Sequence, residues 1–210
     1  TTPNSSEQGN NVYAMLQDDR GFIWLGTKGE GIGISKNPVT QGTSYNQLSF
    51  EWFKHNDNDS TSLPSNNIYD IIQLSPGRFC IGTFGNGISL ASRRMGGKME
   101  FVNINTANSN LSSNLVRSIL LAHDNQLWIA TAFGINCIDI KSLDQAQFQF
   151  RTFFHSPDTP ESLSYNDVVH IFEDNEQHLW FTTYGGGANR LNYKKDQPIR
   201  PGNKIRQKDE

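Results

Sequence analysis

The residues of this chain with the most obvious potential for chemistry are acids. Asp18-Asp19 and Glu173-Asp174 each place two carboxylates side by side, and Asp124 stands in a similar polar setting. Paired carboxylates can act as general acid and general base. These acids, however, recur at one place in a repeat described below, between two apolar segments, where an Asp side chain commonly caps a hairpin turn. We therefore expect them to be structural, and we expect no catalytic residue in this chain.

The segments that look like metal or cofactor motifs lack residues that such motifs need. Asp57-Asn58-Asp59 begins like a calcium loop, and Thr61 could supply the oxygen at its fifth position. Ser62 and Ile68, however, occupy the positions that need Gly and a bidentate Glu. The Gly clusters join strand to strand and open no helix that could hold a phosphate. We expect no metal and no cofactor.

Cysteine chemistry is equally sparse. Cys80 and Cys137 are too few for a disulfide framework, and neither has a Cys or His at metal-ligand spacing. Both lie in apolar segments, so we expect two buried free thiols.

Composition limits the function classes. Lys and Arg total 18 against 21 Asp and Glu, a formal charge of −3 without long runs of one sign, which argues against a nucleic-acid binder. The chain has 13 Phe, 4 Trp and 6 Tyr, a balance that favours strands and tight turns. Its longest apolar runs are far shorter than the roughly 20 residues of a membrane-spanning helix. The first residue is Thr1, not Met, and we expect a piece of a longer protein.

The elements that must position any site come from an internal repeat. Four segments align without gaps, starting near residues 11, 67, 115 and 167. One position, which we call the hub, is tryptophan in three of the four segments. In each segment an apolar residue stands twelve positions before the hub, a Thr stands three positions after it, and a Gly-rich turn follows. The hubs are Trp24, Cys80, Trp128 and Trp180, and the threonines are Thr27, Thr83, Thr131 and Thr183. A residue type that recurs once per repeat is interpreted as scaffold.

Each repeat reads as four short antiparallel strands. In the second repeat these are residues 68–74, 78–83, 88–92 and 99–104, separated by turns at 75–77 and 85–87 and a polar stretch. Fourth strands are also expected at 48–53 and 148–154. Four strands per roughly 50 residues is the blade of a β-propeller. The fold class is therefore all-β, a propeller of four-stranded antiparallel blades with about four blades present.

The repeat resembles a known family. Its apolar strand, polar turn, Trp-x-Gly-Thr and Gly-rich turn, with Ser-Leu at 62–63 and 162–163, are similar to the regulator-propeller repeats of bacterial two-component sensors. The resemblance covers about residues 11–193. It implies the extracytoplasmic sensing region of a hybrid histidine kinase of the Bacteroidetes type, which detects breakdown products of complex glycans. It also implies a periplasmic location, a homodimeric parent protein and control of transcription of polysaccharide-utilisation genes.

The blade count sets the expected domain organisation. Sensors of this family are described with seven blades, which would need about 350 residues. We expect residues 1–193 to form part of a larger, seven-bladed propeller, completed by other repeats of the parent chain. Residues 194–210 are expected to be a polar tail, which leaves four first, second and third strands but only three fourth strands. Open apolar blade faces would need another copy or missing repeats to cover them.

Candidate ligand-binding residues are those that vary between repeats near the channel mouth. On the loops between second and third strands they are Lys28, Glu30, Phe84, Asn86, Phe133 and Tyr184. On the first strands the variable sets are Tyr13, Tyr69, Arg117 and Val169, then Ala14, Asp70, Ser118 and His170, of which Arg117 and His170 are the strongest candidates. Aromatic rings beside amides and charges suit sugars, because rings stack on pyranose C–H surfaces. We expect an oligosaccharide or other small-molecule ligand and no nucleic acid.

Two other function classes stay open from the sequence. A propeller lyase or glycosidase would need convergent acids, or a His and Tyr pair, on the mouth loops. Glu30, Asp70 and Asp167 are the acids placed for this. A protein-interaction propeller of the tryptophan-aspartate type is the third class, although Leu25, Ile129 and Phe181, not Asp, follow the hub tryptophans.

Overall fold

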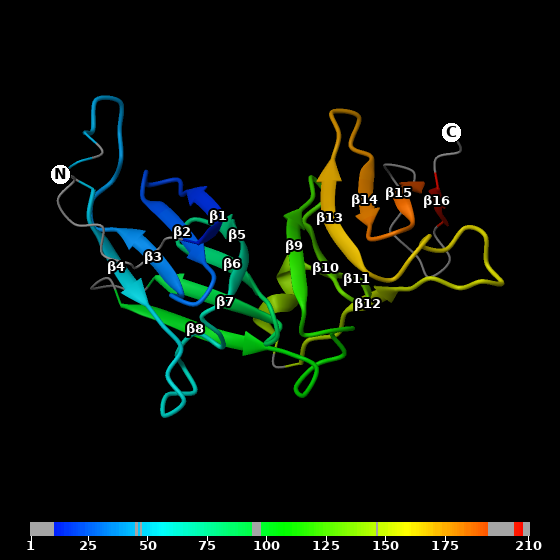
Figure 1. Ribbon diagram of the computed structural model, residues 1–210, viewed down its shortest axis with the longest axis horizontal. Coiled ribbons are helices and arrows are strands. Elements are labelled where there is room, and N and C mark those ends of the chain that lie inside the picture. The colour runs from blue at the N-terminus through cyan, green and yellow to red at the C-terminus, as the bar shows by residue number, and fades with distance from the viewer. Residues whose placement is uncertain are drawn as a thin grey trace. The chain divides into compact units, whose positions relative to one another are not determined.

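The regular secondary structure of the described residues is almost entirely β-strand. The computed structural model describes residues 11–44, 46, 48–93, 98–145, 147–192 and 204–207. They form four antiparallel sheets of four strands each, in which the strands lie in chain order (Figure 1). We call these sheets blades 1 to 4. The predicted all-β blade architecture and the count of four blades are confirmed.

The strand bounds follow the repeat. Blade 1 is β1 (Val12–Gln17), β2 (Ile23–Thr27), β3 (Ile32–Ser35) and β4 (Phe50–Phe53), and blade 2 is β5 (Ile68–Ser75), β6 (Arg78–Thr83), β7 (Ile88–Arg93) and β8 (Met99–Ile104). Blade 3 is β9 (Val116–Leu121), β10 (Gln126–Thr131), β11 (Gly134–Asp139) and β12 (Arg151–Phe153), and blade 4 is β13 (Val168–Glu173), β14 (Leu179–Thr183), β15 (Gly187–Asn192) and β16 (Lys204–Gln207). A 3-10 helix, η2 (Ile140–Asp144), follows β11.

The fourth strand of blade 4 corrects the expectation from the sequence. Residues 204–207 form β16, which pairs with β15 through Asn192↔Lys204 to Asn189↔Gln207. This segment offers one apolar residue among three polar ones, so its pattern carries no strand signal, and backbone pairing with β15 defines it. The rest of the expected polar tail, at 194–203 and 208–210, lies outside the described residues.

In blades 1 and 4 the hub tryptophan is hydrogen-bonded to the turn between the first and second strands. The carboxylate of Asp18 accepts hydrogen bonds from the backbone N–H groups of Arg20 and Phe22 and from the indole Nε1 of Trp24. Asp174 does the same in blade 4, where the indole Nε1 of Trp180 donates at 2.8 Å. The expected turn-capping role of these two aspartates is confirmed.

Blade 3 has the same turn without a carboxylate at the position that accepts from the indole. Ala122 stands where the other two blades have aspartate, and its backbone makes the same turn, accepting from Asn125 N and donating to Gln126 O. The indole Nε1 of Trp128 is buried and has no hydrogen-bond partner among the described residues. Burying a polar group without a hydrogen-bond partner costs free energy, so the Trp128 hub stabilises its blade less than a hub whose indole is hydrogen-bonded.

The recurrent threonines close the turn between second and third strands. Each threonine hydroxyl donates to a glycine carbonyl three or four residues later. The pairs are Thr27–Gly31, Thr83–Gly87, Thr131–Gly134 and Thr183–Gly187. These hydroxyls are buried and engaged, as a scaffold role requires.

The chain divides into two compact units, residues 1–103 and 104–210, each containing two blades. In unit 1 the ring of Trp24 on β2 lies 4.0 Å from that of Phe79 on β6. In unit 2 the ring of Trp128 lies 5.5 Å from that of Phe181 on β14. Both tryptophans are fully buried. In each unit, therefore, the hub tryptophan of the first blade packs on the second strand of the next blade.

Asp124 caps its own turn as expected, since its carboxylate accepts from the backbone N–H of Gln126 at 3.2 Å. The other two turn acids, Asp19 and Glu173, join neighbouring blades within a unit. The Gln73 side chain exchanges two hydrogen bonds with the backbone and side chain of Asp19. At the matching place in unit 2, Glu173 binds His123 through both the backbone N–H and the imidazole. These two acids are structural as expected, although they tie blades together and do not cap their own turns.

Both thiols are buried and free. Burial raises the pKa of Cys80, and it raises that of Cys137 to about 12 even though Arg151 opposes the shift. Each thiol is therefore protonated at neutral pH and unreactive.

Candidate functional site

The first strand of every blade carries a β-bulge at the same position. The register with the second strand shifts by one residue between Val12 and Ala14, between Ile68 and Asp70, and between Val168 and His170. Blade 3 shows the same shift between Val116 and Ser118. The skipped residues are Tyr13, Tyr69, Arg117 and Val169. A bulge re-aims a side chain out of the ladder and is often found beside functional sites.

The residue that opens the second-to-third loop is held next to this bulge. Its backbone N–H donates to the carbonyl of the residue just before the first strand, at 2.8 to 3.0 Å in all four blades. The donors are Lys28, Phe84, Ala132 and Tyr184, and the acceptors are Asn11, Asn67, Leu115 and Asp167. Each blade thus brings two variable positions together at one end of its first strand. We call this place the bulge end.

In unit 1 the bulge ends form an aromatic stack. The rings of Tyr13 and Tyr69 lie 5.0 Å apart at 26°, and those of Tyr69 and Phe84 lie 4.8 Å apart at 21°. Tyr69 is therefore enclosed between two rings. Tyr13 is at the end of the stack and is 52% exposed. Lys28, which is exposed, pairs through its backbone with Asn67 beside the stack.

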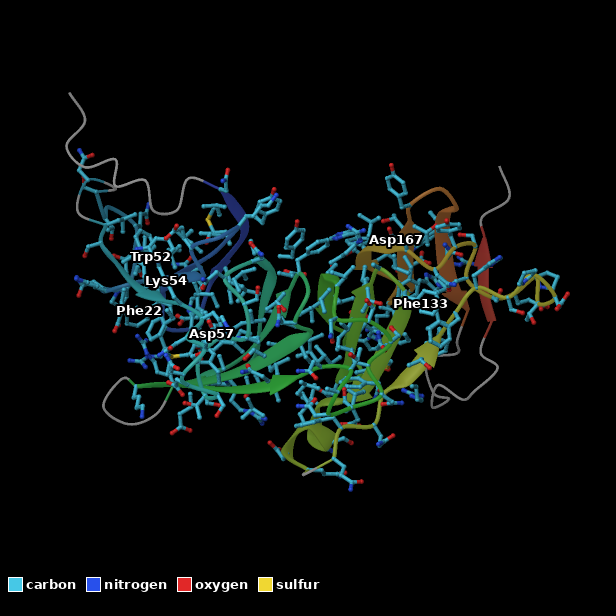
Figure 2. All side chains as sticks on the ribbon, turned by 60° about the horizontal axis from the view of Figure 1, so that its bottom comes forward. Phe22, Trp52, Lys54, Asp57, Phe133 and Asp167 are labelled. Atoms are coloured by element: carbon cyan, nitrogen blue, oxygen red, sulfur yellow. The ribbon has the colours of Figure 1, made fainter. Side chains whose placement is uncertain are left out.

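In unit 2 the bulge ends are polar. Arg117 binds Asp167 in a bidentate pair, with Nε–Oδ1 at 2.7 Å and Nη2–Oδ2 at 2.9 Å. Asp167, labelled in Figure 2, directly precedes β13, so this pair joins blade 3 to blade 4. Such a fork-shaped contact is strong and geometrically specific. Tyr184 is 74% exposed, and His170 places Nδ1 3.3 Å from the hydroxyl of Ser118.

Glu30 and Phe133 lie at the other side of the loop, against the residue that follows the fourth strand. Glu30 forms an ion pair with Lys54 at 2.5 Å, and the ring of Phe133 lies 5.4 Å from that of Phe154. Lys54 and Phe133 are labelled in Figure 2. The two pairs are equivalent in the repeat, one ionic and one aromatic. Asn86 is exposed at the tip of the corresponding turn in blade 2.

The eight residues expected from the sequence therefore fall into two groups. Those at or beside the bulge ends are Lys28, Phe84, Arg117, His170 and Tyr184, and those on the outer side of the loop are Glu30, Asn86 and Phe133. Phe84 belongs to unit 1, and Phe133 and Tyr184 to unit 2. That these three rings share one mouth stays a prediction.

The acids that a hydrolytic site would need are engaged elsewhere. Glu30 is held by Lys54 and Asp167 by Arg117. The carboxylate of Asp70 accepts from the backbone N–H of Ile71. The hydroxyl of Ser118 faces the His170 imidazole, but Ser118 is only 3% exposed, too buried to attack a substrate. Within the described ranges, no group of three or more His, Cys, Asp or Glu side chains could hold a metal ion.

Asp57 and Asp59 serve their own loop. Asp57 binds the imidazole Nε2 of His55, and the carboxylate of Asp59 accepts from the backbone and hydroxyl of Thr61. Both are local contacts, and the Thr61 donors lower the pKa of Asp59.

One recurring structure was missed from the sequence. In the connections from β4 to β5 and from β12 to β13, a histidine Nδ1 contacts a leucine carbonyl eight residues later, and the histidine backbone N–H donates to an asparagine. The residues are His55, Leu63 and Asn66 in unit 1 and His155, Leu163 and Asn166 in unit 2. The Leu63 carbonyl, with Asp57, raises the pKa of His55. The Ser-Leu pair and the histidine eight residues before each leucine recur together, at 55–63 and 155–163, and this shared spacing was the signal in the sequence.

The comparison with protein families matches the repeat. The family described as two component regulator propeller matches residues 6–29, 110–133 and 162–185. These segments contain the first two strands of blades 1, 3 and 4, which are the blades whose hub is tryptophan. In these three segments the chain is therefore similar to two component regulator propeller repeats. No curated protein matches it.

Solved structures share the fold. The extracellular domain of a protein assigned as a hybrid two component system in B. thetaiotaomicron superposes with a TM-score of 0.65 at 24% identity, covering 89% of this chain and 24% of that domain. PorZ, a surface component of the type-IX secretion system of Porphyromonas gingivalis, gives 0.60 at 15%, over 90% and 28%. Virginiamycin B lyase from Staphylococcus aureus gives 0.50 at 12%, over 92% and 59%.

These identities show a common fold and no more. This chain spans about a quarter of the length of the extracellular domain to which it is similar. None of the helices in the described part of the chain is long and apolar enough to cross a membrane.

Proposed function

We propose that this chain is part of the extracytoplasmic ligand-sensing region of a hybrid two-component sensor histidine kinase and response regulator. It binds oligosaccharides derived from glycans, on the periplasmic side of the inner membrane, and performs no catalysis. Ligand occupancy is passed to a kinase through a dimeric parent protein, which controls transcription of polysaccharide-utilisation genes. Further repeats of the parent chain complete the propeller.

The observation that carries this proposal is the bulge end. The same backbone device recurs in four blades, while the side chains that it presents are Tyr, Tyr, Arg and Val. A scaffold that keeps its backbone and varies its side chains at one place has the organisation of a recognition surface. Within each unit, neighbouring bulge ends lie close enough for direct contact between their side chains.

The chemistry at the bulge ends suits a polyhydroxylated ligand. Aromatic rings in unit 1 offer flat apolar faces, and exposed Lys28, His170 and Tyr184 offer hydrogen-bonding groups. Sugars combine apolar C–H faces with hydroxyl edges and use both kinds of contact. The engaged state of Glu30 and Asp167 favours binding over hydrolysis, since a glycosidase needs two free, convergent carboxyl groups.

The proposal is tested by a thermal-shift screen of the chain against host and plant oligosaccharides. A ligand that binds only the folded state raises the melting temperature in proportion to the logarithm of its concentration. A concentration-dependent rise with unchanged sugar, checked by chromatography, supports non-catalytic sensing. Turnover of the sugar would contradict it, and the absence of any shift across the panel would remove the oligosaccharide as ligand.

A further inference from the structure

The aromatic stack in unit 1 differs from ordinary core packing in one respect. Its members belong to two blades, Tyr13 to blade 1 and Tyr69 and Phe84 to blade 2, and the stack ends on an exposed ring. In unit 2 the corresponding bulge residue, Arg117, is held by a bidentate pair with Asp167. Tyr13 has half its surface open, and no hydrogen bond to its hydroxyl ties it to the protein among the described residues.

The stack is held before any ligand arrives. The bulges place Tyr13 and Tyr69, and the hydrogen bond from Phe84 N to Asn67 O fixes the third ring. Tyr69 lies between two rings and cannot rotate freely. Binding to a pre-organised ring loses little conformational entropy, which is why rigid aromatic side chains are effective contact groups.

From this geometry we infer that the open face of Tyr13 is a stacking subsite for one pyranose ring of a β-linked oligosaccharide with equatorial hydroxyls. Such a ring carries its axial C–H bonds on flat faces, so it can continue the stack as a fourth layer. The inference rests on the proposed function and gives it a location. Lys28, which is exposed, and Asn67 pair through their backbones at the same bulge end, so polar side chains are available beside the stack for the hydroxyl edge.

Axially linked sugars fit this subsite poorly. An α-1,4-linked chain curves, and its axial glycosidic oxygen stands on one face of the ring. It therefore offers a smaller continuous apolar surface to a flat phenol ring than a β-1,4-linked chain does. Cellotetraose should bind more tightly than maltotetraose.

The test measures cellotetraose and maltotetraose binding by isothermal titration calorimetry, together with the oligosaccharide panel above. The variants are Tyr13→Ala, Tyr13→Phe and, as a control, Phe172→Ala, which removes an aromatic ring of similar exposure, 56%, from β13 without touching a bulge. We expect Tyr13→Ala to weaken cellotetraose binding about five- to tenfold, the size of one stacking contact. Tyr13→Phe and Phe172→Ala should stay within about twofold of wild type.

The outcomes separate the subsite from the function. If the wild-type chain binds a sugar and Tyr13→Ala binds it equally well, the subsite is wrong while sensing stands. A preference for maltotetraose would also overturn the stacking geometry. If the wild-type chain binds no member of the panel, the proposed function fails, and the subsite with it.

Discussion

At the scale of single residues, the repeat is held by a tryptophan and its acceptor. Trp24 and Trp180 donate their indole N–H to Asp18 and Asp174. Trp128 has no acceptor in the described part of the chain, because Ala122 replaces the carboxylate. The three turns share one backbone geometry, with a residue of positive φ in the same place: Gly21, Asn125 and Gln177. The difference between the blades is therefore one of side chain alone, and it can be reversed by one substitution.

Substituting Ala122→Asp should stabilise the protein. The new carboxylate would accept from the buried indole N–H of Trp128 and from the turn, as Asp18 does in blade 1. The hydrogen bonds to the new carboxylate should stabilise the folded state by more than burial of the charge costs. We therefore expect the unfolding free energy to rise by about 1 kcal/mol and the melting temperature by about 2–4 °C. Differential scanning calorimetry measures this.

The control is the same substitution in a Trp128→Phe background. With no indole N–H to bind, the carboxylate should give a smaller gain or a loss. An equal gain in both backgrounds would mean that the turn, and not the indole, explains the effect.

The second residue-scale prediction concerns acid. The indole of Trp180, with backbone N–H groups of the turn, lowers the pKa of Asp174 from 3.8 to about 2. A carboxyl group whose pKa is lower in the folded state stabilises that state above its unfolded pKa, and the contribution is lost as pH falls through the folded value. The stabilisation from Asp174 should be complete above about pH 4 and disappear between 4 and about 2.

Asp174→Asn tests this. The variant keeps an acceptor oxygen but cannot ionise, so its unfolding free energy, from urea titrations at several pH values, should depend less on pH between 4 and 2 than that of wild type. Parallel pH curves for the two proteins would show that Asp174 does not titrate as stated.

At the scale of elements, the strands follow the sequence pattern where apolar residues define them. The strands expected in the second repeat at 78–83 and 99–104 match β6 and β8, because hydrophobic periodicity and Gly turns mark their ends. The segments expected at 48–53 and 148–154 shorten to β4 and β12. Phe148 instead forms an isolated parallel bridge with Ser109, outside the ladder of β11 and β12. β16 was missed because pairing with β15, and not its own composition, forms it.

The candidate site was predictable in its residues and not in its geometry. The variable positions Tyr13, Tyr69, Arg117 and Val169 stand out when the repeats are aligned, but the bulge that turns them out of the ladder has no sequence signature. The partner of Arg117 is likewise visible only in the structure, since Asp167 comes from the next blade, 50 residues later. Contacts between blades depend on packing, which periodicity does not encode.

The turn between β2 and β3 gives an element-scale prediction with an internal control. Gly29 and Gly31 both have positive φ, at 102° and 77°. A Cβ on Gly31 would lie 2.2 Å from the carbonyl oxygen of Phe53, whereas a Cβ on Gly29 would meet nothing within 4 Å. Gly29→Ala should cost about 1 kcal/mol of unfolding free energy, from backbone strain alone. Gly31→Ala should cost about 2–4 kcal/mol, because overpacking against β4 adds to it.

Urea denaturation of both variants measures the difference. Equal losses would mean that β4 moves aside at no cost, and that its contact with the turn does not define the blade.

At the scale of the whole molecule, the chain is two compact units with separate buried cores. One core is centred on Trp24 and Phe79 and the other on Trp128 and Phe181. Each unit also holds one buried thiol, Cys80 in unit 1 and Cys137 in unit 2. The two thiols therefore report separately on the opening of the two units.

Ligand binding at Tyr13 predicts which thiol is protected. Both thiols are buried and have raised pKa values, so a thiol reagent should label them only when the surrounding core opens. Cellotetraose bound at the stack stabilises the closed form of unit 1 by mass action, so it should slow the labelling of Cys80 in moderate urea. Mass spectrometry of the labelled peptides follows each cysteine in one experiment.

In Tyr13→Ala the sugar should leave the rate of labelling at Cys80 nearly unchanged. Protection of Cys137 alone would place the sugar in unit 2, where the exposed polar side chains of His170 and Tyr184 would be the next residues to substitute.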